Sequence, residues 1–315
     1  MAAGELTTAQ NPETQRVAFL RAMLATVAPR LCVRKYALFS SAPEGEGNVV
    51  QWFRGDRLPI VTTPLAELAD GTDNKQTFSW TTVSGELLSY GGTTVISEKQ
   101  RRTMFGPAFQ SVNKLVSQNA YETIETIDLT VGLTTTSKYY AVVSSGVLGQ
   151  GVNNEKQRAI AADFPEMEGI FGAAGAQPFS NGMYTAILHP KQLVHLKNQA
   201  GTSNDNITWF KQNQFRPEVL AGGDAGSISN VKLESCGLIP SGVLTSGTCY
   251  RGLVLADEGI GTSSLDDGNP NIFINTASQY DTSNPYRNKS TLSWFVDMTV
   301  VLLDSNRVIE YASLI

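Results

Sequence analysis

An apolar stripe about 25 residues long constrains this chain more than any other feature of its sequence. Apolar side chains recur at every third or fourth position: Phe109, Val112, Val116, Ala120, Ile124, Ile127 and Val131. This spacing places them on one face of an α-helix, and about 25 residues of helix extend about 37 Å. We predict a rod-like helix that begins near Pro107 and forms the spine of a domain. Its predicted core positions are Phe109, Val112, Val116, Ile124 and Ile127.

The carboxyl-terminal part of the chain carries the clearest strand pattern. Alternate residues are apolar over one long segment: Leu292, Trp294, Val296, Met298, Val300 and Leu302. This alternation is typical of a strand with one buried face. Asp304-Ser305-Asn306 then favours a turn, and residues 307–312 are expected to return as the hairpin partner of the long strand.

Residues 36–96 form a long excursion between two predicted helices. Strands are expected near residues 48–53 and 76–84, with a segment punctuated by proline and glycine between them. A lone two-stranded ribbon is only marginally stable in water. This ribbon is expected to expose four aromatic side chains, so it must lie against its own body or against a neighbouring molecule. These side chains are Trp52, Phe53, Phe78 and Trp80.

Two further helices are predicted from capping signals. Asn11 and Pro12 suit the start of an amino-terminal helix that ends at Pro29. Ser97 can cap a short helix that precedes the spine, because Gln100 follows three residues later.

The region after the spine helix is predicted to contain both helices and strands. Two short helices are expected, split at Pro165, and a buried strand over residues 184–188 leads into a helix that His189 can cap. Further strands are expected near residues 229–235, 250–256 and 271–275. Helices and strands are segregated rather than alternating, so the predicted fold class is α+β.

Composition excludes several classes of protein. Hydrophobic residues make up 41% of the 315 residues, which excludes a wholly disordered chain. Charged residues make up 17%, below the roughly 25% of an ordinary soluble domain. Because the centres of buried interfaces are poor in charge, this favours assembly with partners. No apolar run approaches the roughly 18 residues of a membrane span, and no secretory signal is expected at the amino terminus.

The sequence offers little catalytic or metal-binding chemistry. Cys32, Cys236 and Cys249 are odd in number and lack the spacing of metal ligands, so they are expected to be reduced and structural. His189 and His195 are the only histidines that could serve in a catalytic triad. No serine lies in a Gly-x-Ser-x-Gly motif, which forms the nucleophile elbow of hydrolases. Both histidines are interpreted as structural. We predict no catalytic residue, no metal and no cofactor.

Three polar segments are interpreted as solvated loops rather than binding sites. Residues 266–271 carry oxygen ligands around a glycine but lack the periodic acids and the closing glutamate of a calcium loop. Residues 222–226 are rich in glycine but lack the Gly-Lys-Ser/Thr ending of a phosphate loop. Residues 44–46, Glu-Gly-Glu, are interpreted as a loop tip rather than a catalytic carboxylate pair.

The amino-terminal segment through Lys35 differs in charge from the rest of the chain. It holds five basic residues and two acidic ones, a net charge of +3, so the remainder carries −8 and the whole chain −5. Such a segment can contact a polyanion, although a solvated helix face explains the same charges. Arg16 and Arg21 are the candidate residues for contact with DNA.

The order of these elements resembles that of the Hong Kong 97-type major capsid proteins of tailed bacteriophages. It runs from an arm and a short helix through a two-stranded excursion, a long spine helix and an α/β region to a long closing strand. Several segments are similar to the branch typified by the coliphage N-four capsid: Gly47–Arg54, Leu58-Pro59, Thr62–Gly71, Leu88–Gly91, Ala186–Pro190, Tyr250–Leu255 and the strand around Trp294. The resemblance runs from about Cys32 to Ala312, although residues 134–180 match no part of it.

The resemblance implies a capsid fold with five segments. They are an N-arm with the first helix (1–35), an E-loop region (36–96), a P-domain with the spine helix (97–180), an A-domain (181–285) and closing P-domain strands (286–315). The family's E-loop lies on a neighbouring subunit, which makes five residues candidate inter-subunit contacts. These residues are Trp52, Phe53, Arg54, Phe78 and Trp80.

The function implied by the resemblance is structural, without catalysis. Such proteins assemble with themselves into hexamers and pentamers of an icosahedral head, which encloses double-stranded DNA non-specifically. Separate scaffolding, decoration and portal proteins are possible partners, and no membrane is involved. The implied location is the virion, with the host cytoplasm during assembly.

Three other interpretations stay open at this point. An encapsulin-like compartment would share the fold type but would package protein cargo, so the nucleic acid content of particles separates the two. Another virion component, such as a decoration or tail protein, differs in particle geometry. A hydrolase has only serine and two histidines in its favour, and a substrate screen would test it.

Overall fold

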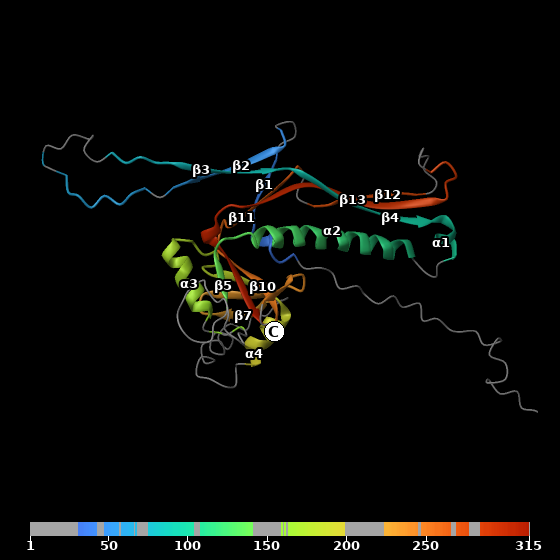
Figure 1. Cartoon of the computed structure of the whole chain (residues 1–315). Coiled ribbons are helices and arrows are strands. Elements are labelled where there is room, and N and C mark those ends of the chain that lie inside the picture. The colour runs from blue at the N-terminus through green and yellow to red at the C-terminus, as the bar shows by residue number, and fades with distance from the viewer. Residues whose placement is uncertain are drawn as a thin grey trace, which may run out of the picture.

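The computed structural model of the chain describes residues 31–42, 47–56, 58–65, 67, 75–103, 108–140, 159, 161, 163–198, 224–244, 247–265, 269–276 and 284–314. The main parts of this structure are two sheets, a long helix and a projecting two-stranded ribbon, with three shorter α-helices (Figure 1). The fold is α+β, as predicted. The predicted amino-terminal helix lies outside the described residues, and so do Arg16 and Arg21.

The long helix α2 (Ala108–Gly132) corresponds to the predicted spine. It packs along the strands β4 (Leu88–Ser97) and β13 (Lys289–Leu302), and Figure 1 shows it running between the two sheets. Val116, Ala120 and Ile124 are buried in the core that it shares with β13, and Val112 and Ile127 pack at the edge of that core. The side chain of Phe109 lies outside the described residues.

One sheet has five strands and is built around β13. Its other members are β1 (Leu38–Ser41), β4, β11 (Ile260–Ser264) and β12 (Asn271–Asn275). The alternating apolar residues of β13 face α2, and Leu292, Trp294, Val296 and Met298 are all buried there. The short helix α1 (Glu98–Thr103) follows β4, and its predicted cap is confirmed, since the Gln100 N–H donates to Ser97 Oγ at 3.1 Å.

The other sheet has seven strands and its own core. Its members are β5 (Lys138–Tyr140), β6 (Tyr184–Leu188), β7 (Asp224–Ile228), β8 (Val231–Ser235), β9 (Ser241–Leu244), β10 (Gly247–Leu255) and β14 (Val308–Leu314). The helix α4 (Pro190–Asn198) follows β6 directly. The predicted histidine cap is confirmed, because the Lys191 N–H donates to His189 Nδ1 at 3.2 Å.

The predicted hairpin at the end of the chain is wrong. Residues 308–314 form β14, which pairs with β10 and β5 in the seven-stranded sheet rather than with β13. The physical reason is that β13 already pairs with β4, β11 and β12. The turn at the 3-10 helix η5 (Ser305–Arg307) therefore carries the chain from one sheet to the other.

The predicted split at Pro165 is also wrong, because a single helix α3 (Asp163–Ala174) contains that residue. Pro165 stands in the first turn, where a backbone N–H has no partner within the helix and its loss costs nothing. Asp163 opens the helix and accepts a hydrogen bond from the Tyr311 hydroxyl at 2.7 Å. This contact holds the start of α3 on the seven-stranded sheet.

Sheet pairing does not follow the segment boundaries expected from the sequence. Residues 181–285 contribute β6 to β10 to the seven-stranded sheet, but β11 and β12 to the five-stranded sheet. Residues 286–315 likewise supply one strand to each sheet. None of the described helices combines the length and the apolar character that crossing a bilayer requires.

Candidate interaction surface

The two-stranded ribbon has two different faces, which follow from its register. It consists of β2 (Val49–Gly55) and β3 (Trp80–Glu86), and in Figure 1 it projects away from the body of the chain. Phe53 pairs with Thr82, and Gly55 pairs with Trp80. Directly opposed residues share a face, so Phe53 and Trp80 lie on one side, which we name the outer face.

The outer face of the ribbon is aromatic and open to solvent. The exposed fractions of Phe53, Phe78 and Trp80 are 66%, 67% and 63%. Phe78 and Trp80 meet edge to face, with ring centroids 6.4 Å apart, and the Trp80 ring lies over Gly55. A cluster of exposed rings on a projecting ribbon is typical of a protein–protein contact surface.

Apolar exposure continues beyond the strands toward the end of the ribbon. Ile60 is 75% exposed and Leu65 is 64% exposed, and Leu58 and Val61 are also exposed. Within the part of the ribbon that the structure describes, these side chains have no packed core of their own. The apolar area available to a partner therefore extends beyond the two strands to the described residues 58–65.

The inner face of the ribbon rests on the body, and it carries Trp52. Val50 pairs with Gly85, and a Cβ on Gly85 would lie 2.4 Å from Val301 and 2.5 Å from Thr299 of β13. Trp52 shares this face by strand alternation and is half-buried. The expectation that Trp52 is exposed beside Phe53 is wrong, because successive residues of a strand point to opposite faces.

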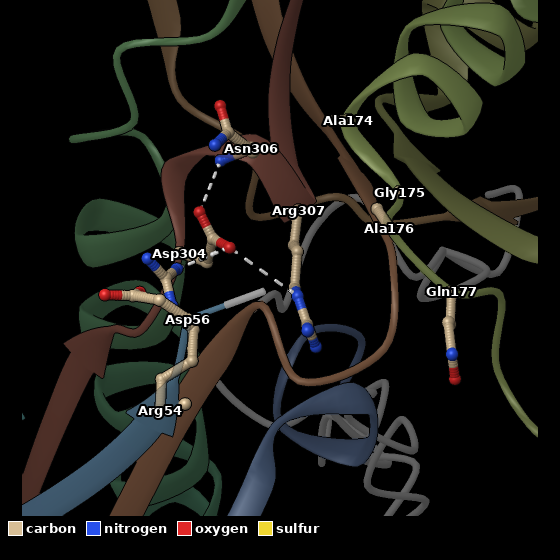
Figure 2. Close-up of a pocket in the computed structure, with 10 residues that line it drawn as sticks. Arg54, Asp56, Ala174, Gly175, Ala176, Gln177, Asp304, Asn306 and Arg307 are labelled. Carbon is tan, nitrogen blue, oxygen red and sulfur yellow. Dashed lines mark hydrogen bonds and ion pairs between the residues drawn. The ribbon is translucent and has the colours of Figure 1, made fainter. Parts of the chain in front are cut away.

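An ion pair anchors the base of the ribbon to the turn between the sheets. Arg54 Nη1 lies 2.5 Å from Asp304 Oδ2, and the other carboxylate oxygen accepts the Asn306 N–H at 3.0 Å. Arg307 Nε lies 3.6 Å from the same Asp304 carboxylate. Figure 2 shows Asp304 between these two arginines. Arg54, a predicted inter-subunit contact, is thus engaged within its own chain.

A polar cavity of about 510 Å³ adjoins this anchor. It lies between the base of the ribbon, the turn at η5 and the end of α3, and its charged lining is Arg54, Asp56, Asp304 and Arg307 (Figure 2). Asp56 accepts hydrogen bonds from the hydroxyls of Ser79 and Thr81, which hold the pKa of its carboxyl below the usual value. Arg54 and Arg307 both pair with Asp304, whereas Asp56 is held by the two hydroxyls.

His189 is occupied by structural contacts. Its ring stacks on Tyr250 with centroids 3.7 Å apart, and its Nδ1 accepts the Lys191 N–H. Burial, together with the nearby Lys191 charge, lowers the pKa of His189. The imidazole therefore serves as a helix cap, and its capping nitrogen cannot act as a general base while that bond holds.

Two buried acids of α2 hold the segment from Cys32 to Arg34. Glu125 Oε1 accepts the N–H groups of Cys32 at 3.0 Å and Val33 at 2.7 Å. One turn further on, Asp128 is fully buried, with Arg34 Nη1 at 3.8 Å. Burial raises the pKa of both acids, that of Asp128 to about 7, although the Arg34 charge opposes the rise.

We expect Asp128 to make the folded chain lose stability as the pH rises through about 7. Its folded pKa lies above the ordinary value of 3.8, so the folded state keeps a proton that the unfolded state releases. Wild type should lose about 1–3 kcal/mol of unfolding free energy between about pH 5 and about pH 8, and Asp128→Asn should lose less. Urea unfolding at both pH values measures this, with Glu122→Gln on the same helix as control. Parallel pH profiles for wild type and Asp128→Asn would contradict it.

Three cysteines are described, and all are buried without a disulfide. Cys249 lies on β10, whereas Cys32 and Cys236 lie together beside Glu125. The ligand atoms of this Cys32–Glu125–Cys236 cluster are within 4.8 Å of one another. These are the described side chains that could hold a metal ion.

Several other segments singled out in the sequence fall outside the described residues. They are residues 44–46, 222–223 and 266–268.

No family model and no curated protein sequence matches this chain. Solved structures do match it over nearly its whole length. It is similar to the capsid of Ralstonia phage GP4, with 10% identity, a TM-score of 0.72, and coverage of 99% of this chain and 98% of that chain. It is similar to the cyanophage Pam1 capsid, with 12% identity, a TM-score of 0.71, and coverage of 99% of both chains. The capsid of Helicobacter pylori bacteriophage KHP30 matches at 10% identity and a TM-score of 0.67, also over 99% of both chains.

The chain has the Hong Kong 97-type capsid fold. The resemblance stated from the sequence is therefore confirmed at the level of the fold, and the branch typified by the coliphage N-four capsid stays a prediction.

Two features of this capsid fold had no signal in the sequence. Arg54 and Asp304 meet only because β13 ends beside the base of the ribbon, 250 positions along the chain. The Cys32–Glu125–Cys236 cluster joins three separate elements, with 93 positions between Cys32 and Glu125 alone. Neither pairing follows from local periodicity or from motif spacing.

Proposed function

We propose that this chain is the major capsid protein of a tailed bacteriophage. In this role it assembles with itself into hexamers and pentamers of an icosahedral head around double-stranded DNA, without catalysis. The observation that carries the proposal is the likeness to phage capsid structures over almost the whole of both chains. The virion is then its location, with the host cytoplasm as the place of assembly.

The elements of the structure correspond in this proposal to the parts of a capsid subunit. The β2–β3 ribbon is the E-loop, and α2 is the spine helix of the P-domain. The five-stranded sheet that packs on α2 belongs to the P-domain, and the seven-stranded sheet forms the core of the A-domain. The P-domain and the A-domain are thus assigned by sheet and not by consecutive segments of the chain, because residues 181–285 and 286–315 each supply strands to both sheets.

The exposed outer face of the ribbon supports self-association. Burying one large apolar side chain contributes about 1.5–3 kcal/mol, and the outer face presents Phe53, Phe78 and Trp80 together. A ribbon that reaches onto the next copy makes a head-to-tail contact, and such contacts close into rings when the rotation between copies allows. Hexamers and pentamers are rings of this kind.

Contact with DNA is proposed for the basic amino-terminal segment. Arg16 and Arg21 would neutralise phosphates without reading sequence, so the contact should weaken as salt rises. Separate scaffolding, decoration and portal proteins complete the proposed set of partners. Purified particles should contain DNA, whereas particles that hold only protein cargo would favour a compartment shell.

Limited proteolysis tests the proposed role of the ribbon. We expect proteases to cleave within residues 41–75 in the unassembled chain, because the described residues there are mostly exposed. In assembled particles the same segment should be protected by the neighbouring subunit. Mass spectrometry of the fragments gives the cleavage sites, and equal cleavage in both states would count against the E-loop assignment.

A further inference from the structure

Three elements that are far apart in the sequence meet at one buried point, the Cys32–Glu125–Cys236 cluster. Cys32 precedes the 3-10 helix η2 (Arg34–Tyr36), Glu125 belongs to α2, and Cys236 follows β8. Their exposed fractions are 3%, 0% and 2%. The two sulfur atoms and a carboxylate oxygen lie within 4.8 Å of one another, which is close enough for all three to reach a single ion.

Glu125 supplies the observation that points to a cation. Its Oε1 accepts two backbone N–H groups, whereas its Oε2 is buried with no hydrogen-bond partner among the described residues. A buried carboxylate oxygen without a partner costs free energy, because it has lost its hydrogen bonds to water and makes no hydrogen bond in the folded protein. A metal ion beside the two sulfur atoms would complete that oxygen's coordination.

Backbone hydrogen bonds hold both cysteines at this point. The Cys236 N–H donates to the Leu188 carbonyl oxygen at 2.9 Å, and the Cys32 N–H donates to Glu125 Oε1 at 3.0 Å. The positions of the two sulfur atoms are therefore fixed by backbone contacts as well as by packing.

We propose that Cys32, Cys236 and Glu125 bind one Zn²⁺ ion in a structural site. Two thiolates and one carboxylate suit zinc, which takes sulfur and oxygen ligands in tetrahedral geometry. The Ser235 carbonyl oxygen accepts a hydrogen bond from Cys32 Sγ at 3.7 Å, so it lies beside the site and is a candidate for the fourth position. Binding releases one proton from each thiol that is protonated, so affinity should rise with pH.

The charges around the site are compatible with this assignment. Two thiolates and a carboxylate exceed the charge of Zn²⁺ by one negative unit, and the Arg34 guanidinium already acts on the Glu125 carboxylate as a nearby positive charge. The ion would fasten the segment at Cys32 to the spine helix and to the end of β8 in the seven-stranded sheet. This role does not depend on the proposed assembly into shells.

Metal analysis of the full, reduced chain tests the proposal. After equilibration with Zn²⁺ and removal of unbound metal, we expect one zinc per chain. Cys236→Ser and Glu125→Gln should each weaken zinc binding by about tenfold or more. Cys249→Ser is the matched control, because Cys249 is equally buried but lies outside the cluster, and it should bind zinc as wild type does.

A cobalt titration of the wild-type chain keeps the test independent of how the variants fold. Co²⁺ should give a thiolate-to-metal charge-transfer band that saturates at one equivalent, and Zn²⁺ should abolish it. Reduced wild type that retains no zinc and shows no such band would overturn the proposal. Zinc binding that survives in a folded Cys236→Ser variant would also overturn it. The same holds if the two cysteines form an intramolecular Cys32–Cys236 disulfide and bind no metal.

Discussion

Replacing Phe78 and Trp80 together with serine should leave the chain folded and prevent it from assembling. Both rings lie on the outer face of the ribbon, outside the described cores, so the isolated chain loses little when they are removed. At about 1.5–3 kcal/mol for each buried side chain, every contact between subunits should weaken by about a hundredfold or more. Sedimentation velocity and electron microscopy of wild type and variant measure the result.

Thr82→Ser is the control for this double variant. Thr82 lies on the same face of β3, opposite Phe53, but carries no ring. It should assemble as wild type does, and circular dichroism should show that all three proteins are folded. Intact shells from the Phe78→Ser, Trp80→Ser chain would mean that the aromatic outer face is not a subunit contact.

Trp294→Ala should be the most damaging substitution in the core between α2 and the five-stranded sheet. Trp294 is 4% exposed, and its indole N–H donates to Asn119 Oδ1 on α2 at 3.1 Å. Removing a buried tryptophan leaves a cavity and costs about 3–5 kcal/mol. Urea unfolding of the unassembled chain should therefore show a midpoint far below that of wild type.

Phe295→Ala is the matched control, because it removes a ring from the next position of the same strand. Phe295 points to the opposite face of β13 and is 40% exposed. Its loss should cost about 1 kcal/mol or less, as expected for a site that leaves no closed cavity. Equal losses for the two variants would mean that α2 does not cover the sheet as described.

The sequence predicted the elements whose signals are local. The spine helix, the caps at Ser97 and His189 and the long strand β13 each depend on a few neighbouring residues, and all are present. The order of the elements was sufficient to indicate the capsid fold, although sequence identity to the capsid structures is only 10–12%.

The errors arose where distant parts of the chain compete for the same partner. A turn after a long strand normally makes a hairpin, but β13 already pairs with three other strands, so β14 joins the other sheet. A proline breaks a helix in its interior but is tolerated in its first turn. The sequence alone did not show that Pro165 lies in the first turn of α3. Both outcomes depend on tertiary context that no local pattern contains.

The candidate surface was only partly predictable. Phe53, Phe78 and Trp80 are exposed as expected, whereas alternation along β2 turns Trp52 toward the body. Arg54 was expected at a subunit contact, and the structure shows its intramolecular ion pair with Asp304. The cluster of Cys32, Glu125 and Cys236 could not be predicted at all, because its members come together only when the segment before η2, the helix α2 and the end of β8 meet in the folded chain.

Electron microscopy of the purified chain, expressed alone and concentrated, shows whether it assembles with itself. We expect closed shells, or rings of five or six subunits in which each ribbon lies on the neighbouring copy. A folded chain that stays monomeric at every concentration, with residues 41–75 equally open to protease throughout, would contradict it.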